Sequence, residues 1–207
     1  MSNPVRVILI TDGDKMARRA METAAARLGM RCISASAGNP SPLSGPELLA
    51  LIREAAYDPV LVMVDDKGNP GTGPGENLIE LLCTSSEVQV LGAIAVASNT
   101  RRAQGTPVDV SVTRDGRLVE CPVDKDGNPI VHRPHLQGDT VDVLNRLDLP
   151  VVVGIGDPGK MDGADGLRNG CAVTVRAIME IVSRTIGQAP DFSGAGAGAE
   201  ANSQTNP

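Results

Sequence analysis

The stretch VRVILITDGDKMARRAMETAAARLG, residues 5–29, changes its hydrophobic pattern once. Residues 5–11 form a short, mostly β-branched apolar run, which predicts a strand buried on both faces. An Asp-Gly-Asp turn follows, and apolar residues then recur at helical spacing until Gly29, a residue type that commonly ends a helix. A strand that leads through a tight turn into a helix is typical of parallel α/β sheets. The apolar positions of the predicted helix are Met16, Ala17, Ala20, Met21, Ala24, Ala25 and Leu28.

The same alternation continues along the chain. Ser44 and Glu47 form a capping-box pattern that opens a second predicted helix, with Pro46 in its first turn. A third helix is expected around residues 77–82, and a last helix extends to Ile186. Alternating strands and helices predict an α/β fold with a doubly wound, mainly parallel, Rossmann-like or flavodoxin-like sheet. Its further strands are expected at residues 31–35, 60–64, 90–97 and 151–156.

The pattern changes between the last two of these strands. Residues 108–112 alternate valine with polar residues, Asp115 and Gly116 are a strong turn signal, and the run RLVECPV follows. We therefore expect an antiparallel β-hairpin insertion that spans about residues 106–135. Residues 1–187 are expected to form a single domain. The tail at 188–207 is expected to be disordered, because its small and polar residues cannot bury apolar surface.

The composition argues against several functional classes. The net charge is −6, and Tyr57 and Phe192 are the only aromatic residues. Nucleic-acid binding, in contrast, calls for a basic surface and, for single strands, aromatic stacking. No apolar run approaches the roughly 20 residues that span a bilayer, and the N-terminal run is too short for a signal peptide. We expect a cytoplasmic protein with reduced cysteines, no nucleic-acid partner and no direct membrane insertion.

Acidic residues follow the carboxyl ends of the predicted parallel strands. In a doubly wound sheet these ends share one edge, where ligands bind. Two carboxylates within about 4 Å repel by roughly 4 kcal/mol at an effective dielectric near 20, so such a cluster needs a cation, a shared proton or Lys160. Oxygen ligands favour magnesium or calcium over zinc. The candidate ligand-binding residues are Asp12, Gly13, Asp14, Ser98, Gly156, Asp157 and Lys160, and the candidate metal ligands are Asp12, Asp65, Asp66 and Asp157.

Two alternatives remain open for these acidic residues. Asp12 and Asp65 are also suited to capping the helices that follow them. The layout of acids after the first and third strands, Ser98 after the fourth and Lys160 after the last also resembles a phosphorylatable receiver domain, although only at the level of the fold. In that case the protein would be a metal-dependent phosphoryl-transfer or phosphoacceptor domain.

The segment GIGDPGKM, residues 154–161, matches two nucleotide-binding patterns only in part. A P-loop would have Ser or Thr where Met161 stands, and a helix would follow at once. The dinucleotide pattern G-x-G-x-x-G would precede a helix and a further strand, and no such strand is predicted. We interpret the glycines as small residues that relieve steric crowding where the chain leaves the last parallel strand.

Three other features are weaker candidates. The loop KGNPGTGPG could bring backbone N–H groups to an anion, although a flexible surface loop is the simpler interpretation. His132 and His135 lie in a proline-interrupted segment and are expected at the surface. Arg101 and Arg102 could neutralise an anionic ligand beyond the fourth strand, with a solvated basic pair as the default.

Long motifs run from about residue 5 to residue 187. They are VILITDGDKMARRA, CISASAGNPSPLSG, DPVLVMVDDKGNPGTGPGE, VLGAIAVAS, VDVSVTRDG and GDTVDVLNRLDLPVVVGIGDPGKMDG. Together they resemble the soluble stage V sporulation protein AE family of endospore-forming bacteria, and the tail lies outside this resemblance. The motifs coincide with the strand ends chosen above on physical grounds.

The resemblance implies a role in sporulation. The family belongs to a set of proteins, several of them embedded in the membrane, that move calcium dipicolinate into the developing spore and release it in germination. For this chain, it implies an accessory or regulatory protein without established catalytic residues. Such a protein would bind a ligand, a cation or a partner at its acidic strand ends, next to membrane-embedded sporulation proteins. The expected location is the cytoplasmic side of the forespore or inner spore membrane, and homo-oligomerisation stays open.

Overall fold

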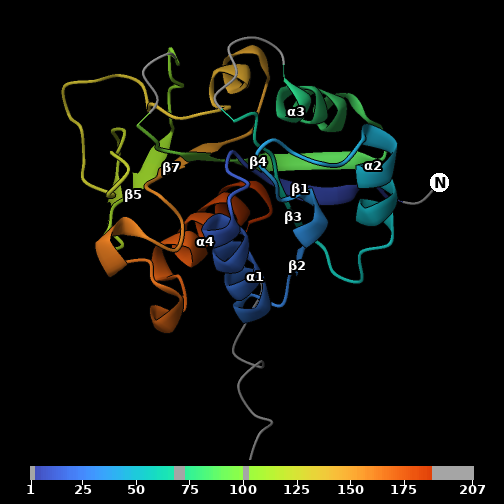
Figure 1. The fold of residues 1–207 in the computed structure, drawn as a ribbon, viewed down its shortest axis with the longest axis horizontal. Coiled ribbons are helices and arrows are strands. Elements are labelled where there is room, and N and C mark those ends of the chain that lie inside the picture. The colour runs from blue at the N-terminus through green and yellow to red at the C-terminus, as the bar shows by residue number, and fades with distance from the viewer. Residues whose placement is uncertain (1–2, 68–72, 100–102, 188–207) are drawn as a thin grey trace, which may run out of the picture.

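The computed structural model describes residues 3–67, 73–99 and 103–187, and these residues form one mixed sheet with helices around it (Figure 1). Arg101 and Arg102, most of the glycine-rich loop (68–72) and the tail (188–207) lie outside the described residues. The strands are β1 (Val5–Ile10), β2 (Arg31–Cys32), β3 (Val60–Met63), β4 (Val88–Val96), β5 (Val110–Val112), β6 (Leu118–Val119) and β7 (Val152–Ile155). The α-helices are α1 (Lys15–Arg27), α2 (Gly45–Arg53), α3 (Pro74–Thr84) and α4 (Ala172–Thr185). The short 3₁₀ helices are η1 (Ser34–Ser36), η2 (Asp142–Arg146), η3 (Met161–Gly163) and η4 (Leu167–Asn169).

The sheet confirms the predicted fold class. Its strand order is β2-β3-β1-β4-β7-β5-β6, and every neighbouring pair is parallel except β5 and β6. This is an α/β, Rossmann-like architecture with one antiparallel pair at the sheet edge. Because β1, β3, β4 and β7 run in the same direction, their carboxyl ends share one edge of the sheet.

Helices cover both faces of the sheet (Figure 1). α1 and α4 pack on one face, and α2 and α3 pack on the other. Successive strand residues point to opposite faces, so Ile8 and Ile10 join the core under α1 and α4, whereas Val7 and Leu9 join the other core. All four side chains are fully buried. Burial on both faces explains why β1 is an uninterrupted apolar run, since each such side chain contributes about 1.5–3 kcal/mol when buried.

Polar side chains cap the starts of α1 and α2. At α2, the backbone N–H of Ser44 donates to Glu47 Oε2 (2.8 Å), and the capping box is present. At α1, Asp14 is the N-cap, and its Oδ1 accepts hydrogen bonds from the N–H groups of Met16 and Ala17, both at 2.7 Å. The cap of α1 is therefore Asp14, and not Asp12 as the capping alternative supposed.

No helix within the described residues combines the length and the apolar character that crossing a membrane requires. The longest of them, α4, has 14 residues, compared with the roughly 20 that a spanning helix needs.

The second strand is shorter than predicted, because serine side chains replace its later backbone contacts. β2 ends at Cys32, and the chain turns into η1. Ser36 Oγ accepts a hydrogen bond from the N–H of Met63 (2.9 Å), and Ser41 Oγ accepts one from the N–H of Asp65 (2.9 Å). The N–H groups at the end of β3 are thus satisfied by hydroxyl groups where a longer strand would offer carbonyls.

The predicted hairpin is present as β5 and β6. Ser111 pairs with Val119 in antiparallel register, and the turn between the two strands contains Gly116 at φ +80°. β5 also pairs in parallel with β7, where Ser111 lies beside Gly154. The insertion therefore extends the sheet next to the last parallel strand.

Candidate functional site

The carboxyl ends of four parallel strands surround one cavity of about 200 Å³. Asp12 follows β1, Asp65 follows β3 and Asp157 follows β7, and all three face this space although they are far apart in sequence. Ser98, after β4, also lines it. We call this space the acidic cavity, and its charged lining residues are Asp12, Asp14, Asp65, Asp139, Asp157 and Lys160.

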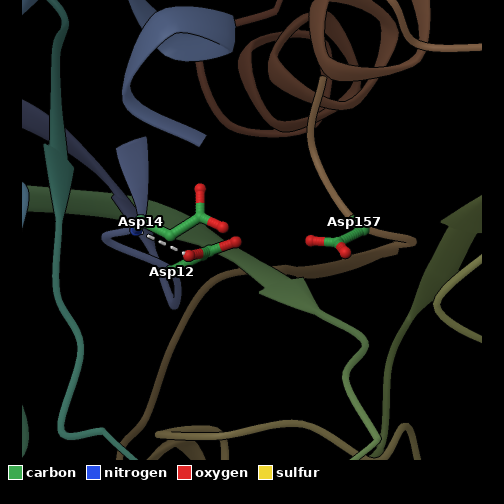
Figure 2. Close-up of side chains that lie close together, drawn as sticks. All are labelled: Asp12, Asp14 and Asp157. Atoms are coloured by element: carbon green, nitrogen blue, oxygen red, sulfur yellow. Dashed lines mark hydrogen bonds between the residues drawn. The ribbon is translucent and has the colours of Figure 1, made fainter. Parts of the chain in front are cut away.

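Three of these carboxylates lie close enough to share a cation. Asp12, Asp14 and Asp157 each offer an oxygen atom, and these oxygens lie within 4.8 Å of one another. Figure 2 shows the Asp12 and Asp14 side chains next to each other, with Asp157 facing them from beyond β7. The backbone N–H of Asp14 donates to Asp12 Oδ1 (2.9 Å), which fixes one oxygen of this group. Oxygen ligands of this kind suit magnesium or calcium.

Lys160 supplies a positive charge to two of the three carboxylates. Its Nζ lies 2.7 Å from Asp14 Oδ2, and 3.2 Å and 3.3 Å from the two oxygens of Asp157. Burial lowers the pKa of Lys160, but the hydrogen bond to Asp14 and the charges of Asp157 and Asp14 outweigh burial and raise it above its ordinary value. The Lys160 side chain is 41% exposed, so solvent screens these ion pairs.

The same contacts set the protonation of Asp14. Burial raises its pKa, but the hydrogen bonds from Lys160 and from the N–H of Ala17 outweigh this effect. The pKa of Asp14 therefore lies below its ordinary value, and Asp14 is a carboxylate at neutral pH.

Asp12 behaves in the opposite way. Burial raises the pKa of Asp12 to about 7, against the lowering effect of the hydrogen bond from Asp14 N–H. The charges of Asp14, Asp65 and Asp157 raise it further. Near neutral pH, Asp12 therefore carries a proton for part of the time, and a cation in the cavity would displace this proton.

Asp65 lies on the wall of the cavity and is only 4% exposed. Its Oδ1 accepts a hydrogen bond from the N–H of Lys67 (2.8 Å), and its Oδ2 accepts one from the N–H of Gly13 (3.3 Å). Burial raises the pKa of Asp65, the two N–H donors lower it, and the charges of Asp139 and Asp66 raise it again, with a net rise. Asp65 therefore links the loop after β1 to the loop after β3.

Asp66, the other half of the predicted acidic pair, does not line the cavity. Its carboxylate accepts hydrogen bonds from the N–H groups of Gly75 (2.6 Å) and Glu76 (2.9 Å), in the first turn of α3. The glycines allow this approach, because a Cβ on Gly73 would collide with the Asp66 side chain and one on Gly75 would lie 2.8 Å from Asp65 O. The N–H groups at the start of this helix thus bind the protein's own Asp66 side chain, and most of the loop that could approach an anion lies outside the described residues.

The remaining predicted residues shape the cavity through the backbone. Ser98 Oγ accepts a hydrogen bond from the N–H of Asp139 (3.1 Å). A Cβ on Gly13 would collide with the backbone of Gly38, and a Cβ on Gly156 would lie 2.7 Å from Lys125 O. Both glycines therefore permit close backbone contacts beside the cavity, as the interpretation of GIGDPGKM predicts for Gly156.

Four lining residues were not among the predicted candidates, and two of them, Thr11 and Val96, belong to predicted strands. The other two are Asp139 and Asn39. Asp139 lies in the irregular segment before η2, and Asn39 lies in the loop after η1. Neither Asp139 nor Asn39 comes directly after a predicted strand, so strand-end reasoning could not select them. The motif GDTVDV around Asp139 offered one signal, since it is a polar turn before an apolar run.

GIGDPGKM has neither form of nucleotide loop. Its Lys160 ammonium is engaged by Asp14 and Asp157, and the N–H of Gly159 donates to Asp165 Oδ2 (2.9 Å). The segment leads into the 3₁₀ helix η3, and α4 begins only at Ala172. His132 and His135 are exposed, as predicted, and all four cysteines are free and at least partly buried.

Comparison with known sequences identifies one family. The sequence model described as stage V sporulation protein AE1 matches residues 6–185, which is most of the chain. No curated protein and no solved structure matches the chain. The family match covers all four strand ends that surround the acidic cavity.

Proposed function

This chain belongs to the stage V sporulation protein AE1 family, and on that basis we propose that it is an accessory protein in the movement of calcium dipicolinate into the spore and its release in germination. Membership of this family is the evidence for a sporulation-related role. In the proposal, the protein acts beside membrane-embedded sporulation proteins at the cytoplasmic face of the forespore or spore membrane. Its acidic cavity binds a divalent cation, either free or presented by a ligand or partner.

The charge of the acidic cavity carries this proposal. Five carboxyl groups and one ammonium group line it. Lys160 contacts Asp14 and Asp157, which leaves Asp12, Asp65 and Asp139 to be balanced by protons, backbone N–H groups or a bound cation. A divalent cation would offset this excess of negative charge more completely than Lys160 alone.

The size of the cavity favours a cation that keeps part of its water. The cavity volume of about 200 Å³ leaves room for several water molecules, each of which takes up about 30 Å³ in the liquid. Magnesium retains several waters when proteins bind it, whereas calcium takes six to eight oxygen ligands. Free dipicolinate carries two carboxylates and would be repelled by this lining, so we expect it to enter only together with calcium.

Calorimetric titration tests the proposal directly. We expect calcium or magnesium to give a saturable binding heat, and dipicolinate to give heat only in the presence of calcium. An absence of heat with both cations, alone and with dipicolinate, would exclude cation binding. The remaining possibility would be a role through contacts with other proteins alone.

Substitutions identify the residues that bind the cation. Asp157→Asn removes one of the three converging carboxylates and should weaken the cation-dependent rise in melting temperature. Asp148→Asn is the matched control, since it makes the same chemical change at a residue outside the acidic cavity. Equal rises in the two variants would show that the cation binds elsewhere.

A second candidate function is a phosphoacceptor or phosphoryl-transfer domain. The observation in its favour is that Asp65, Ser98 and Lys160 line the same cavity as the acids after β1. The sheet order differs from the flavodoxin-like order 2-1-3-4-5, because β3 and not β1 lies beside β2. Incubation with a small phosphodonor and magnesium, followed by intact-mass measurement, tests it: an unchanged mass counts against the phosphoacceptor, and phosphatase and phosphodiesterase assays address turnover.

A further inference from the structure

Asp165 is a fully buried aspartate outside the acidic cavity, and both of its carboxylate oxygens accept hydrogen bonds. Its Oδ1 accepts hydrogen bonds from the N–H groups of Val173 (2.8 Å) and Thr174 (3.1 Å). Its Oδ2 accepts hydrogen bonds from Thr174 Oγ1 (2.6 Å) and from the N–H of Gly159 (2.9 Å). Four donors therefore converge on one carboxylate, a group that only accepts when ionised.

Two of these donors are backbone N–H groups in the first turn of α4. The N-cap residue of this helix, Cys171, has a left-handed backbone (φ 53°) and makes no side-chain capping hydrogen bond. The N–H groups of a first helical turn need partners from outside the helix. Asp165 supplies them from the preceding loop, and it thereby anchors itself to α4.

The other contacts of Asp165 hold the backbone that carries Lys160. The N–H of Gly159 donates to the Asp165 side chain, and the N–H of Asp165 donates to the carbonyl of Lys160 (3.3 Å). The segment adopts left-handed backbone at Gly159 (φ 73°) and again at Met161 (φ 47°). A non-glycine residue adopts this conformation only when its surroundings impose it.

We propose that Asp165 is the positioning residue of the acidic cavity. It ties the loop of Lys160 to the start of α4, so that Nζ of Lys160 stays between Asp14 and Asp157. The consequence for cation binding rests on the proposed function, but the position of Lys160 does not. The two can therefore be tested separately.

Zero-length cross-linking measures this position without any ligand. A water-soluble carbodiimide joins an amine to a carboxylate in contact with it, forming an amide as the carbodiimide takes up the water that is lost and becomes a urea. Lys15, Lys67, Lys125 and Lys160 are the only lysines of the chain, so peptide mapping can assign each product. In the parent protein we expect links from Lys160 to Asp14 and Asp157, and the Lys125–Asp126 ion pair (2.9 Å) serves as an internal reference.

The variant Asp165→Asn keeps the shape of the side chain but replaces one acceptor oxygen with a donor. The pair of donors that contacts the replaced oxygen then loses its acceptor. The yield of Lys160 cross-links should therefore fall severalfold relative to the Lys125–Asp126 reference. Asp66→Asn is the matched control, because Asp66 is also buried and also binds the first turn of a helix, α3, but does not line the cavity. It should keep the parent yield of Lys160 links.

Thr174→Val covers the case in which Asp165→Asn fails to fold. It removes only the hydroxyl that donates to Asp165 Oδ2 and leaves both backbone N–H groups in place. We expect a smaller decrease of the Lys160 links in this variant. The proposal is overturned if folded Asp165→Asn keeps the parent yield, if Asp66→Asn lowers it equally, or if Thr174→Val is the only folded variant and leaves it unchanged. Failure of the protein to bind calcium or magnesium would not affect these results.

Discussion

Asp65 and Asp66 are neighbours in sequence, yet their side chains serve different parts of the molecule. Asp65 lines the acidic cavity, whereas Asp66 binds the N–H groups that begin α3. A carboxylate at this end of a helix also interacts favourably with the helix dipole. Strand-end position alone could not separate the two residues, because which carboxylate turns inward depends on the approach of Gly73 and Gly75.

The role of Asp66 leads to a prediction about stability. Asp66→Asn should lower the free energy of unfolding by about 1–3 kcal/mol, because one of the two N–H groups that it binds, at Gly75 and Glu76, loses its acceptor. Urea denaturation measures this loss. The cation-dependent rise in melting temperature should remain, and its disappearance would place Asp66 among the cation ligands.

Gly156 leads to a prediction about the wall of the acidic cavity. In Gly156→Ala, the added Cβ would lie 2.7 Å from both Lys125 O and Gly127 N, which are backbone atoms. The N–H of Asp157 donates to Lys125 O (2.8 Å), so relief of the collision should also displace Asp157. We expect a loss of about 1–3 kcal/mol in urea denaturation and weaker cation binding by calorimetry. Unchanged affinity would show that Asp157 is placed independently of this loop.

At the scale of elements, local sequence patterns were enough to predict those helices, strands and turns whose structure depends on one segment alone. The β1 run, the capping box of α2 and the Asp-Gly turn between β5 and β6 were all predicted and are all present. The length of β2 was not predictable, because its end depends on Ser36 and Ser41 reaching β3. Such contacts join residues more than twenty positions apart and leave no periodic signal.

The hydrogen bond from the Asp65 N–H to Ser41 leads to a prediction about stability. Ser41→Ala leaves the buried N–H of Asp65 without its acceptor and should cost about 1–3 kcal/mol of unfolding free energy. Hydrogen exchange of the Asp65 amide should accelerate in parallel. Ser183→Ala is the control, since Ser183 is exposed and bonds only within α4, and it should change stability by no more than about 0.5 kcal/mol. Equal effects of the two substitutions would contradict the role given to Ser41.

At the scale of the whole molecule, the meeting of distant acids was predictable from one rule of topology. Parallel strands end at a shared edge, so the strand pattern of the sequence was enough to bring Asp12, Asp65 and Asp157 together. Asp139 could not be predicted in this way, because it comes from an irregular part of the chain before η2. Nor could the sequence show that Lys160 contacts Asp14 and Asp157, since this depends on how Asp165 holds the loop.

The gathered acids make the stability of the molecule depend on pH in a defined direction. The pKa of Asp12 is about 7 in the folded protein, against an ordinary value of 3.8. Between these two values the folded chain holds a proton that the unfolded chain has lost, so the contribution of Asp12 to stability falls as pH rises. Above about pH 7 this contribution is gone, and the folded protein retains an unfavourable buried carboxylate.

Asp12→Asn isolates this effect, because an amide does not titrate and its oxygen can still accept the Asp14 N–H. The variant should be more stable than the parent at about pH 8 and should have no advantage at about pH 4, as measured by urea denaturation at both values. If the cavity binds calcium, saturating calcium at the higher pH should reduce the advantage of the variant, because the cation stabilises the ionised Asp12 of the parent. If the variant exceeds the parent in stability by the same amount at both pH values, Asp12 does not hold its proton more tightly in the folded state. The electrostatic argument for a cation at this sheet edge would then be wrong.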